Sequence, residues 1–147
     1  MKNIDPSKIR SILVEIPLSG FPAAGIFSFS LGSVAQLRDC VGLISVEAFN
    51  TTLQSKGVSG GTNLSDAGYK ASYLTISDVG NTEIRAQIPV AKLIRSNGNS
   101  QIEKLNIFGS AANPRPIDPQ RSKFTISDTT LIGASTVALL EFVYVAP

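Results

Sequence analysis

The sequence contains no histidine and no tryptophan, and it has a single cysteine, Cys40. Without histidine there is no Ser–His or Cys–His pair for nucleophilic catalysis and no histidine-rich metal site. One cysteine excludes an intrachain disulfide and an ordinary structural zinc site, and Cys40 is expected to pack as a small hydrophobic side chain. These absences remove the commonest catalytic and metal-binding chemistries of small enzymes.

Charge is also scarce, because charged residues make up 16% of the chain and the formal net charge is +2. No block of like charges is present to contact several phosphates, so the sequence indicates no direct nucleic-acid partner. A chain with few charges has less solvated surface, which favours contact with other proteins. No apolar run reaches the ~20 residues of a membrane-spanning helix, the N-terminal segment lacks the apolar part of a secretory signal, and nothing indicates contact with a viral membrane.

What the sequence does contain is alternation of apolar and polar residues in short segments. The run from Ile12 to Ile16 and the run from Ala138 to Tyr144 are apolar at every second position. This period places one face of a strand against a core. The sequence predicts eight strands, within residues 8–17, 25–31, 41–49, 69–77, 82–89, 104–109, 122–127 and 135–147.

Turn-forming residues separate the predicted strands. Residues 77–82 (SDVGNT) are typical of a hairpin turn, and residues 96–100 (SNGNS) give a second turn signal. Longer connections are expected at 50–68 and at 109–121, and three prolines favour an extended crossing in the second. Residues 32–40 are compatible with one helical turn or a short strand, and residues 89–96 with a short helix after Pro89.

Strands at short spacing, tight hairpins mixed with long crossings, and almost no helix indicate an all-β sandwich. Eight strands with several long connections favour a jelly roll over an up-and-down barrel, whose connections are uniformly short. An immunoglobulin-like sandwich is the main alternative, although its Cys, Trp, Cys core is absent. We expect one eight-stranded jelly-roll domain over residues 1–147 with at most short helical turns, and an extended N-terminal tail at 1–8.

The remaining candidates for chemistry are carboxylates and glycine-rich turns. Asp66 and Asp78 lie in turns that do not follow a calcium-binding loop pattern. No nucleophile elbow and no phosphate-binding loop is present. A glycosidase needs two carboxylates, but no spacing selects a pair from the many that are available: Asp39, Glu47, Glu83, Glu103, Asp118, Asp128 and Glu141. The sequence therefore predicts a protein that is not an enzyme, with no catalytic residue, no metal site and no cofactor.

Two predicted strands are apolar on both faces and supply a candidate interface. If residues 69–77 form a strand, Tyr69, Ala71 and Tyr73 face away from the core, and Leu13 does the same on the first strand. Such side chains are either covered by a loop of the same chain or contact another subunit. Tyrosine is enriched at interfaces because it joins a large apolar area to a polar tip.

The order of segments in the second half resembles a known family. A strand that runs into IPV and then AKLIR precedes the short LNIFG, and a proline-rich PIDPQRSKFTI leads to the last strand, VALLEFVYV. This order resembles the single-jelly-roll capsid proteins of tailless icosahedral bacteriophages, most of all their vertex (penton) proteins. The resemblance extends from Tyr69 to Val145 and rests on Ile88, Pro89, Leu93, Ile117, Asp118, Ser122 and Ile126.

The resemblance implies a structural virion protein at the capsid vertex. Copies of an upright jelly roll would form a homopentamer that contacts the major capsid protein and seats a spike protein. Such a ring joins one side of each subunit to a different side of the next. The alternative function is a receptor- or carbohydrate-binding β-sandwich, such as a fibre head or lectin-like module, and a metal-free glycosidase is the third hypothesis.

Overall fold

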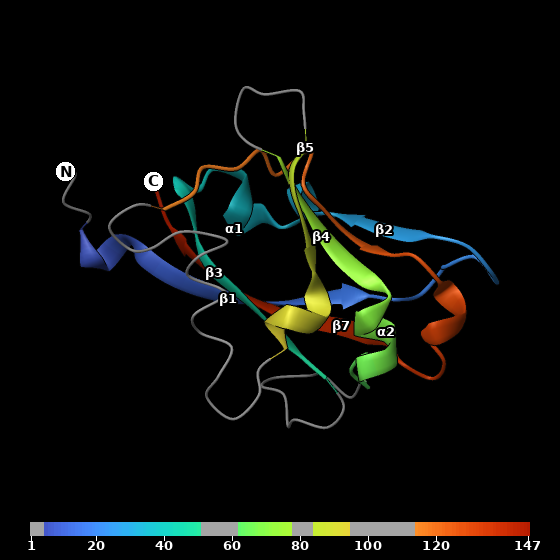
Figure 1. Ribbon diagram of the computed structural model, residues 1–147. Helices are drawn as coiled ribbons and strands as arrows, with labels where there is room; N and C mark the ends of the chain where they lie inside the picture. The colour runs from blue at the N-terminus through green and yellow to red at the C-terminus, as the bar shows by residue number, and fades with distance from the viewer. Residues whose placement is uncertain (1–4, 51–61, 78–83, 95–113) are drawn as a thin grey trace.

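The computed structural model describes residues 5–50, 62–77, 84–94 and 114–147, and these residues are mostly β-structure (Figure 1). Their seven strands form two antiparallel sheets. One sheet has the order β1 (Ile9–Pro17), β7 (Val137–Val145) and β3 (Gly42–Phe49). The other has the order β2 (Phe27–Ser30), β6 (Lys123–Ile126), β4 (Ser72–Ser77) and β5 (Ile84–Pro89). The prediction of a β-sandwich is confirmed at this level.

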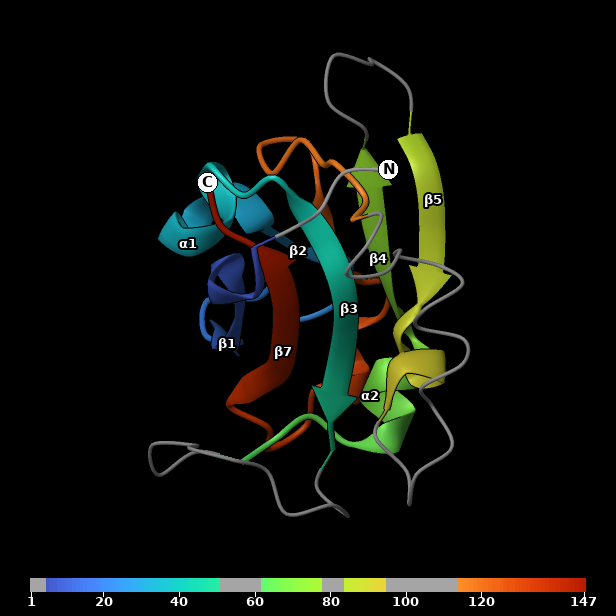
Figure 2. The same cartoon turned by 90° about the vertical axis from the view of Figure 1, so that its left-hand side faces the viewer.

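Helical structure in the described ranges is limited to short turns. Two are α-helical, α1 (Ala35–Arg38) and α2 (Asp66–Lys70), and they lie at opposite ends of the sandwich (Figures 1 and 2). The other turns are 3-10 helices at Pro6–Lys8, Leu31–Ser33, Val90–Leu93 and Thr129–Leu131. Of the two alternatives for residues 32–40, the helical turn is the one present, and the helical structure considered after Pro89 is a 3-10 turn. In these ranges, no helix has the length and apolar character needed to cross a lipid bilayer.

Side chains from both sheets meet in one core. Leu74 of β4, Phe124 of β6 and Phe142 of β7 are fully buried and belong to the same cluster of apolar residues. Full burial of one such side chain stabilises the fold by roughly 1.5–3 kcal/mol relative to its exposure to water. The predicted alternation on β4, β6 and β7 is therefore confirmed, and it accounts for the stacking of the two sheets.

The C-terminal strand is largely buried on both of its faces, with Val137, Glu141 and Val143 half-buried on the outer one. β7 lies between β1 and β3, with Leu140 and Phe142 in the core. Leu139 and Val145 alternate to the outer face and are buried there as well. A central strand that is covered on both sides needs apolar residues at most positions. This position explains why the last segment is the most apolar in the sequence.

The predicted strand at 69–77 is wrong at its start, because β4 begins only at Ser72. Residues 66–70 instead form α2, which the side chain of Ser65 caps by accepting a hydrogen bond from the backbone N–H of Gly68. Asp66 in the first turn and Lys70 in the last turn both interact favourably with the helix dipole. A serine cap followed by these charges stabilises a helical turn at the point where alternation predicted a strand.

The alternation of β3 is interrupted at one residue. Regular alternation over residues 41–49 predicts that Ile44, Val46 and Ala48 share the inner face, but Leu43 takes the place of Ile44 in the core cluster. A shift in register between Leu43 and Ser45, opposite β7, is the cause. One extra residue in a bulge moves the preceding side chains to the other face of the strand.

The N-terminal segment differs from the expected extended tail. Pro6–Lys8 form a 3-10 turn, and the side chain of Asp5 accepts a hydrogen bond from the N–H of Ser7. The backbone carbonyl of Lys8 accepts a hydrogen bond from the N–H of Ala146, which fixes this turn to the end of the chain. Residues 1–4 lie outside the described residues.

Three of the sequence predictions fall on segments that the structure does not describe. The strand at 104–109 and the turn at 96–100 lie entirely outside the described residues. Most of the hairpin turn at 77–82 does so too, although β4 and β5 pair as antiparallel neighbours, as a hairpin requires.

Candidate functional site

The four candidate interface residues do not form one patch. Leu13 is half-buried. It lies on the outer face of β1, because its neighbour Val14 points into the core and successive side chains of a strand point to opposite faces. Tyr73 is half-buried on the outer face of β4, whose next residue, Leu74, points into the core. The two sheets pack through their inner faces, so Leu13 and Tyr73 lie on opposite sides of the sandwich.

Tyr69 lies inside the molecule and not on its surface. Its side chain on α2 is fully buried, so its assignment to an exposed strand face is wrong. The hydroxyl donates a hydrogen bond to the carbonyl of Phe49, at 2.9 Å, and accepts one from the N–H of Leu139, at 3.1 Å. Phe49 and Leu139 are register partners at the end of β3 and β7, so this hydroxyl bridges the two strands where their pairing ends.

Burial raises the pKa of the Tyr69 hydroxyl, against a smaller opposite effect of its hydrogen bond with Leu139. The same hydroxyl in an unfolded chain has a pKa of about 10. Above that pH the folded state binds more protons than the unfolded state, so the free energy of unfolding falls as pH rises.

We therefore expect alkaline destabilisation of up to about 1.4 kcal/mol per pH unit from this one group. The measurement is urea unfolding of the wild type and of Tyr69→Phe from about pH 8 to about pH 11. The variant lacks the titrating hydroxyl, so its stability is expected to fall less steeply. If the free energy of unfolding falls equally steeply with pH in both proteins, the raised pKa does not belong to the Tyr69 hydroxyl.

Ala71 is half-buried at the C-terminal end of α2, and its backbone has a structural role. Its carbonyl accepts hydrogen bonds from both the N–H and the hydroxyl of Ser127, each at 2.8 Å. Ser127 directly follows β6, so these bonds fix the junction between α2 and β4 to the neighbouring strand. The bonds to Ala71 therefore fix the backbone two residues before Tyr73, which is the first residue of β4 with an outward side chain.

The outer side of the four-stranded sheet has a groove of about 460 Å³, hereafter the outer groove. All four strands contribute to it: Ser28 from β2, Lys123 and Thr125 from β6, Tyr73, Thr75 and Ser77 from β4, and Gln87 from β5. Ile26, Gln120 and Arg121 complete its rim. The volume lies within the range of about 300–1,000 Å³ that is typical of ligand sites.

The strand register explains how polar side chains gather in the outer groove. Ser28, Thr125 and Tyr73 form one row across β2, β6 and β4, and the hydroxyls of Ser28 and Thr125 lie 3.1 Å apart. Lys123 and Thr75 lie in the adjacent row. Thr75 and Thr125 are almost fully buried although they face outward. Their hydroxyls therefore form the floor, and the longer side chains form the walls.

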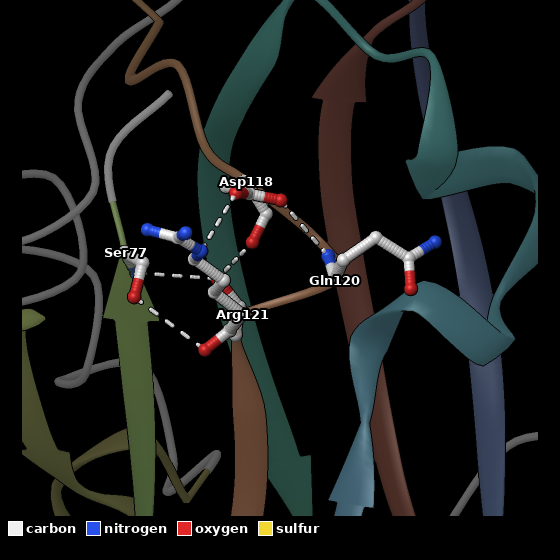
Figure 3. Close-up of polar contacts among 5 residues, drawn as sticks. Ser77, Asp118, Gln120 and Arg121 are labelled. Carbon is white, nitrogen blue, oxygen red and sulfur yellow. Dashed lines mark hydrogen bonds and ion pairs between the residues drawn. The ribbon is translucent and has the colours of Figure 1, made fainter. Parts of the chain in front are cut away.

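A tight turn at Asp118 holds one end of the outer groove in place (Figure 3). Asp118 accepts a hydrogen bond from the N–H of Gln120 through its carboxylate, and from the hydroxyl of Ser122 through its carbonyl. The N–H of Asp118 donates to the carbonyl of Ser77, and the hydroxyl of Ser77 donates to the carbonyl of Arg121. These bonds fix the turn to the end of β4, so Gln120 and Arg121 reach the groove from a rigid base.

The charges that the described residues bring to the outer groove are positive. Of these residues, Arg121 and Lys123 line it and no carboxylate does. Arg121 lies 3.6 Å from the Asp118 carboxylate just outside the lining, and both side chains are partly exposed, so this ion pair contributes little to stability. No ion pair of Lys123 is present among the residues that the structure describes. An anion in the groove would lie beside this exposed ammonium group.

The outer face of the three-stranded sheet has a different character. Leu13 of β1 lies directly opposite Glu141 of β7, which in turn lies opposite Glu47 of β3. The neighbouring row contains Glu15 of β1 beside Leu139 and Phe49, of which the last two are buried. Apolar and acidic side chains thus alternate here, whereas the outer groove on the other sheet is polar and basic.

Two other sequence predictions can be compared with the structure. Cys40 is half-buried against the core, and burial raises the pKa of its thiol, which fits a packing role better than a nucleophile. In the described part of the chain, no three side chains of His, Cys, Asp or Glu gather as metal ligands would.

Reasoning from sequence missed the outer groove as a site. Tyr73 was predicted as an interface residue, Gln120 and Arg121 fell in a predicted connection, and the other lining residues were given no role. The feature of the sequence that could have indicated the groove is the set of serine and threonine residues at outward positions of the predicted strands. Only the order β2-β6-β4-β5 places these strands side by side.

No protein-family model, curated protein or solved structure gives a significant match to this chain.

Proposed function

We propose that this chain is a structural subunit of an icosahedral virus shell, a vertex (penton) protein built on a jelly roll. The observation that carries the proposal is the order of strands in the two sheets. In an eight-stranded jelly roll, one sheet contains the first, eighth, third and sixth strands, and the other the second, seventh, fourth and fifth. The sequence predicts a further strand at residues 104–109, between β5 and β6. If that strand is counted as the sixth along the chain, β6 is the seventh strand and β7 is the eighth.

With that numbering, the two described sheets follow the jelly-roll order. The sheet β1-β7-β3 becomes first, eighth, third, and the sheet β2-β6-β4-β5 becomes second, seventh, fourth, fifth. An immunoglobulin-like sandwich has its first two strands side by side in one sheet. Here β1 and β2 belong to different sheets, which argues against that alternative.

The described residues on either side of 95–113 both lie beside β3. Ile94 forms a parallel bridge with Ala48 near the end of β3, and Arg115 forms an antiparallel bridge with Leu43 near its start. These two flanking residues therefore lie beside opposite ends of an edge strand. This supports the proposal that the predicted strand at 104–109 pairs antiparallel with β3.

The surface of the sandwich suits a head-to-tail ring. A cyclic ring brings two different surfaces of each subunit into contact with its neighbours. The outer face of β1-β7-β3 contains the half-buried aliphatic side chains Leu13, Val137 and Val143, so a neighbour that covers them would bury further apolar area. The opposite side of the sandwich is polar, which makes the two sides distinct. We propose that the aliphatic face is one of the two ring contacts.

Light scattering of the purified chain tests this proposal. We expect a mass near that of a pentamer, about 78 kDa, five times the 15.5 kDa of one chain. Leu13→Lys places a charge in the aliphatic face and is expected to shift the mass to that of the monomer. The fold is expected to tolerate this change, because Leu13 is only half-buried and the new ammonium lies opposite Glu141.

The matched control is Gln36→Lys, which adds the same charge at an exposed position on α1. It should assemble as the wild type does. A wild-type chain that is monodisperse as a monomer, or a Leu13→Lys variant that assembles normally while folded, would contradict the proposed contact.

A further inference from the structure

We infer that the outer groove is a binding site for an acidic saccharide, meaning a sugar unit that carries a carboxylate, such as a sialic or uronic acid. This inference goes beyond a role in the shell and does not depend on it. It rests on three observations: the composition of the lining, the rigidity of the floor and rim, and the sign of the charges.

The composition of the lining suits a sugar. Hydroxyl groups of Ser28, Thr75 and Thr125 and the amide of Gln87 line the groove, and each can both donate and accept hydrogen bonds. A sugar presents the same mixture of donors and acceptors. Ser28 and Thr125 are already bonded to each other, but a purely apolar ligand would leave the hydroxyl of Thr75 and the amide of Gln87 without partners and lose free energy.

The groove also offers limited apolar contact at two places. Tyr73 provides an aromatic side chain, and Ile26, which also lines the groove, is 62% exposed although it is a large hydrophobic residue. A pyranose ring has one face rich in C–H groups, and an aromatic side chain with a polar tip can contact such a mixed surface. Polar floor and apolar contact together favour a sugar over a simple inorganic anion.

The site is largely formed before any ligand arrives. Thr75 and Thr125 are held in the paired strands β4 and β6, and the turn at Asp118 is fixed by hydrogen bonds to β4. Rigid elements position binding groups with little loss of entropy when the ligand binds. Gln120 and Arg121 are therefore presented in defined positions at one end of the groove.

The charge of the groove selects an acidic sugar. In the described part of the lining, Arg121 and Lys123 are the charged residues, and the Asp118 carboxylate that pairs with Arg121 lies just outside it. Lys123 has no ion-pair partner among the described residues. A carboxylate beside these groups would form charge-assisted hydrogen bonds, which are about twice as strong as neutral ones. A neutral sugar would leave that interaction unused, so we expect weaker binding of neutral sugars.

The test is a titration of the full chain with three probes, followed by NMR or calorimetry: sialyllactose, a galacturonic acid disaccharide, and neutral lactose. We expect at least one acidic probe to bind at least tenfold more tightly than lactose. Lys123→Gln is expected to remove that preference, and Tyr73→Ala to weaken every sugar that binds. Lys70→Gln, an exposed lysine on α2 outside the groove, is the matched control and should bind as the wild type does.

Each other outcome would overturn the inference. No binding of either acidic probe would do so, as would equal affinity for acidic and neutral probes. Equal loss in Lys70→Gln and Lys123→Gln would show a general charge effect. Competition by a short poly-glutamate peptide at the same concentration would show a site for anions in general or for acidic peptides. Thermal unfolding of each variant verifies that the fold is retained.

Discussion

Replacement of Tyr69 by phenylalanine is expected to lower the free energy of unfolding by about 2–4 kcal/mol. The change removes only the hydroxyl, which donates to the carbonyl of Phe49 and accepts from the N–H of Leu139. Both backbone groups lie where β3 and β7 end their pairing, inside the protein. Loss of a partner for a buried polar group has a penalty of about 1–3 kcal/mol for each group. Urea unfolding of the two proteins measures the difference.

The matched control is Tyr144→Phe. Tyr144 lies on β7 and is 5% exposed, but its hydroxyl forms no hydrogen bond among the described residues. The same chemical change at this position is expected to alter stability by less than about 0.5 kcal/mol. Equal effects of the two substitutions would show that the Tyr69 hydroxyl does not join the strands as described.

Replacement of Gly42 by alanine is expected to destabilise the fold by about 2–4 kcal/mol. A Cβ atom at this position would lie 2.8 Å from the carbonyl carbon and oxygen of Arg115 and 3.0 Å from the carbonyl carbon of Pro114. These are backbone atoms, so no side-chain rotation relieves the clash. Arg115 must move, and its two backbone hydrogen bonds with Leu43, at 2.8 and 2.9 Å, are then lost or stretched.

Gly20→Ala separates this steric effect from the general effect of replacing glycine. Gly20 has a φ of +76° with open space around its added methyl, so its substitution introduces only backbone strain of about 1–2 kcal/mol. Hydrogen exchange gives the specific readout, since only Gly42→Ala should lose protection at the amides of Leu43 and Arg115. Normal protection of both amides in that variant would contradict the close contact between β3 and the segment at Arg115.

The sequence predicted the strands well because alternation is a local property. Residues such as Phe124, Ile126, Leu140 and Phe142 repeat at every second position, and all four are buried in the structure. Alternation fails as a predictor where one side chain, by capping a helix, favours a helical turn over a strand. Ser65 caps α2, and the capped turn takes residues 66–70 out of the predicted strand.

Pairing between distant segments could not be predicted in the same way. The register shift in β3 depends on how this strand meets β7, which lies about a hundred residues later in the chain. Nothing near Ile44 in the sequence indicates it. The burial of Tyr69 likewise depends on α2 packing over the ends of two strands that come from distant parts of the chain.

The candidate site was hidden for the same reason. Ser28, Thr125 and Tyr73 are far apart in sequence, and each alone is an ordinary outward residue on a strand. They form one row because β6 pairs with both β2 and β4. Sequence reasoning selected Tyr73 as a surface aromatic but could not place it in a groove.

The central claim is that this sandwich assembles with its own copies into a vertex ring. Electron microscopy of the purified wild-type chain tests it most directly, because class averages report both the symmetry and the number of subunits. We predict closed rings with fivefold symmetry, and their loss in Leu13→Lys. A field of isolated single-chain particles, or closed assemblies of another symmetry, would contradict the claim.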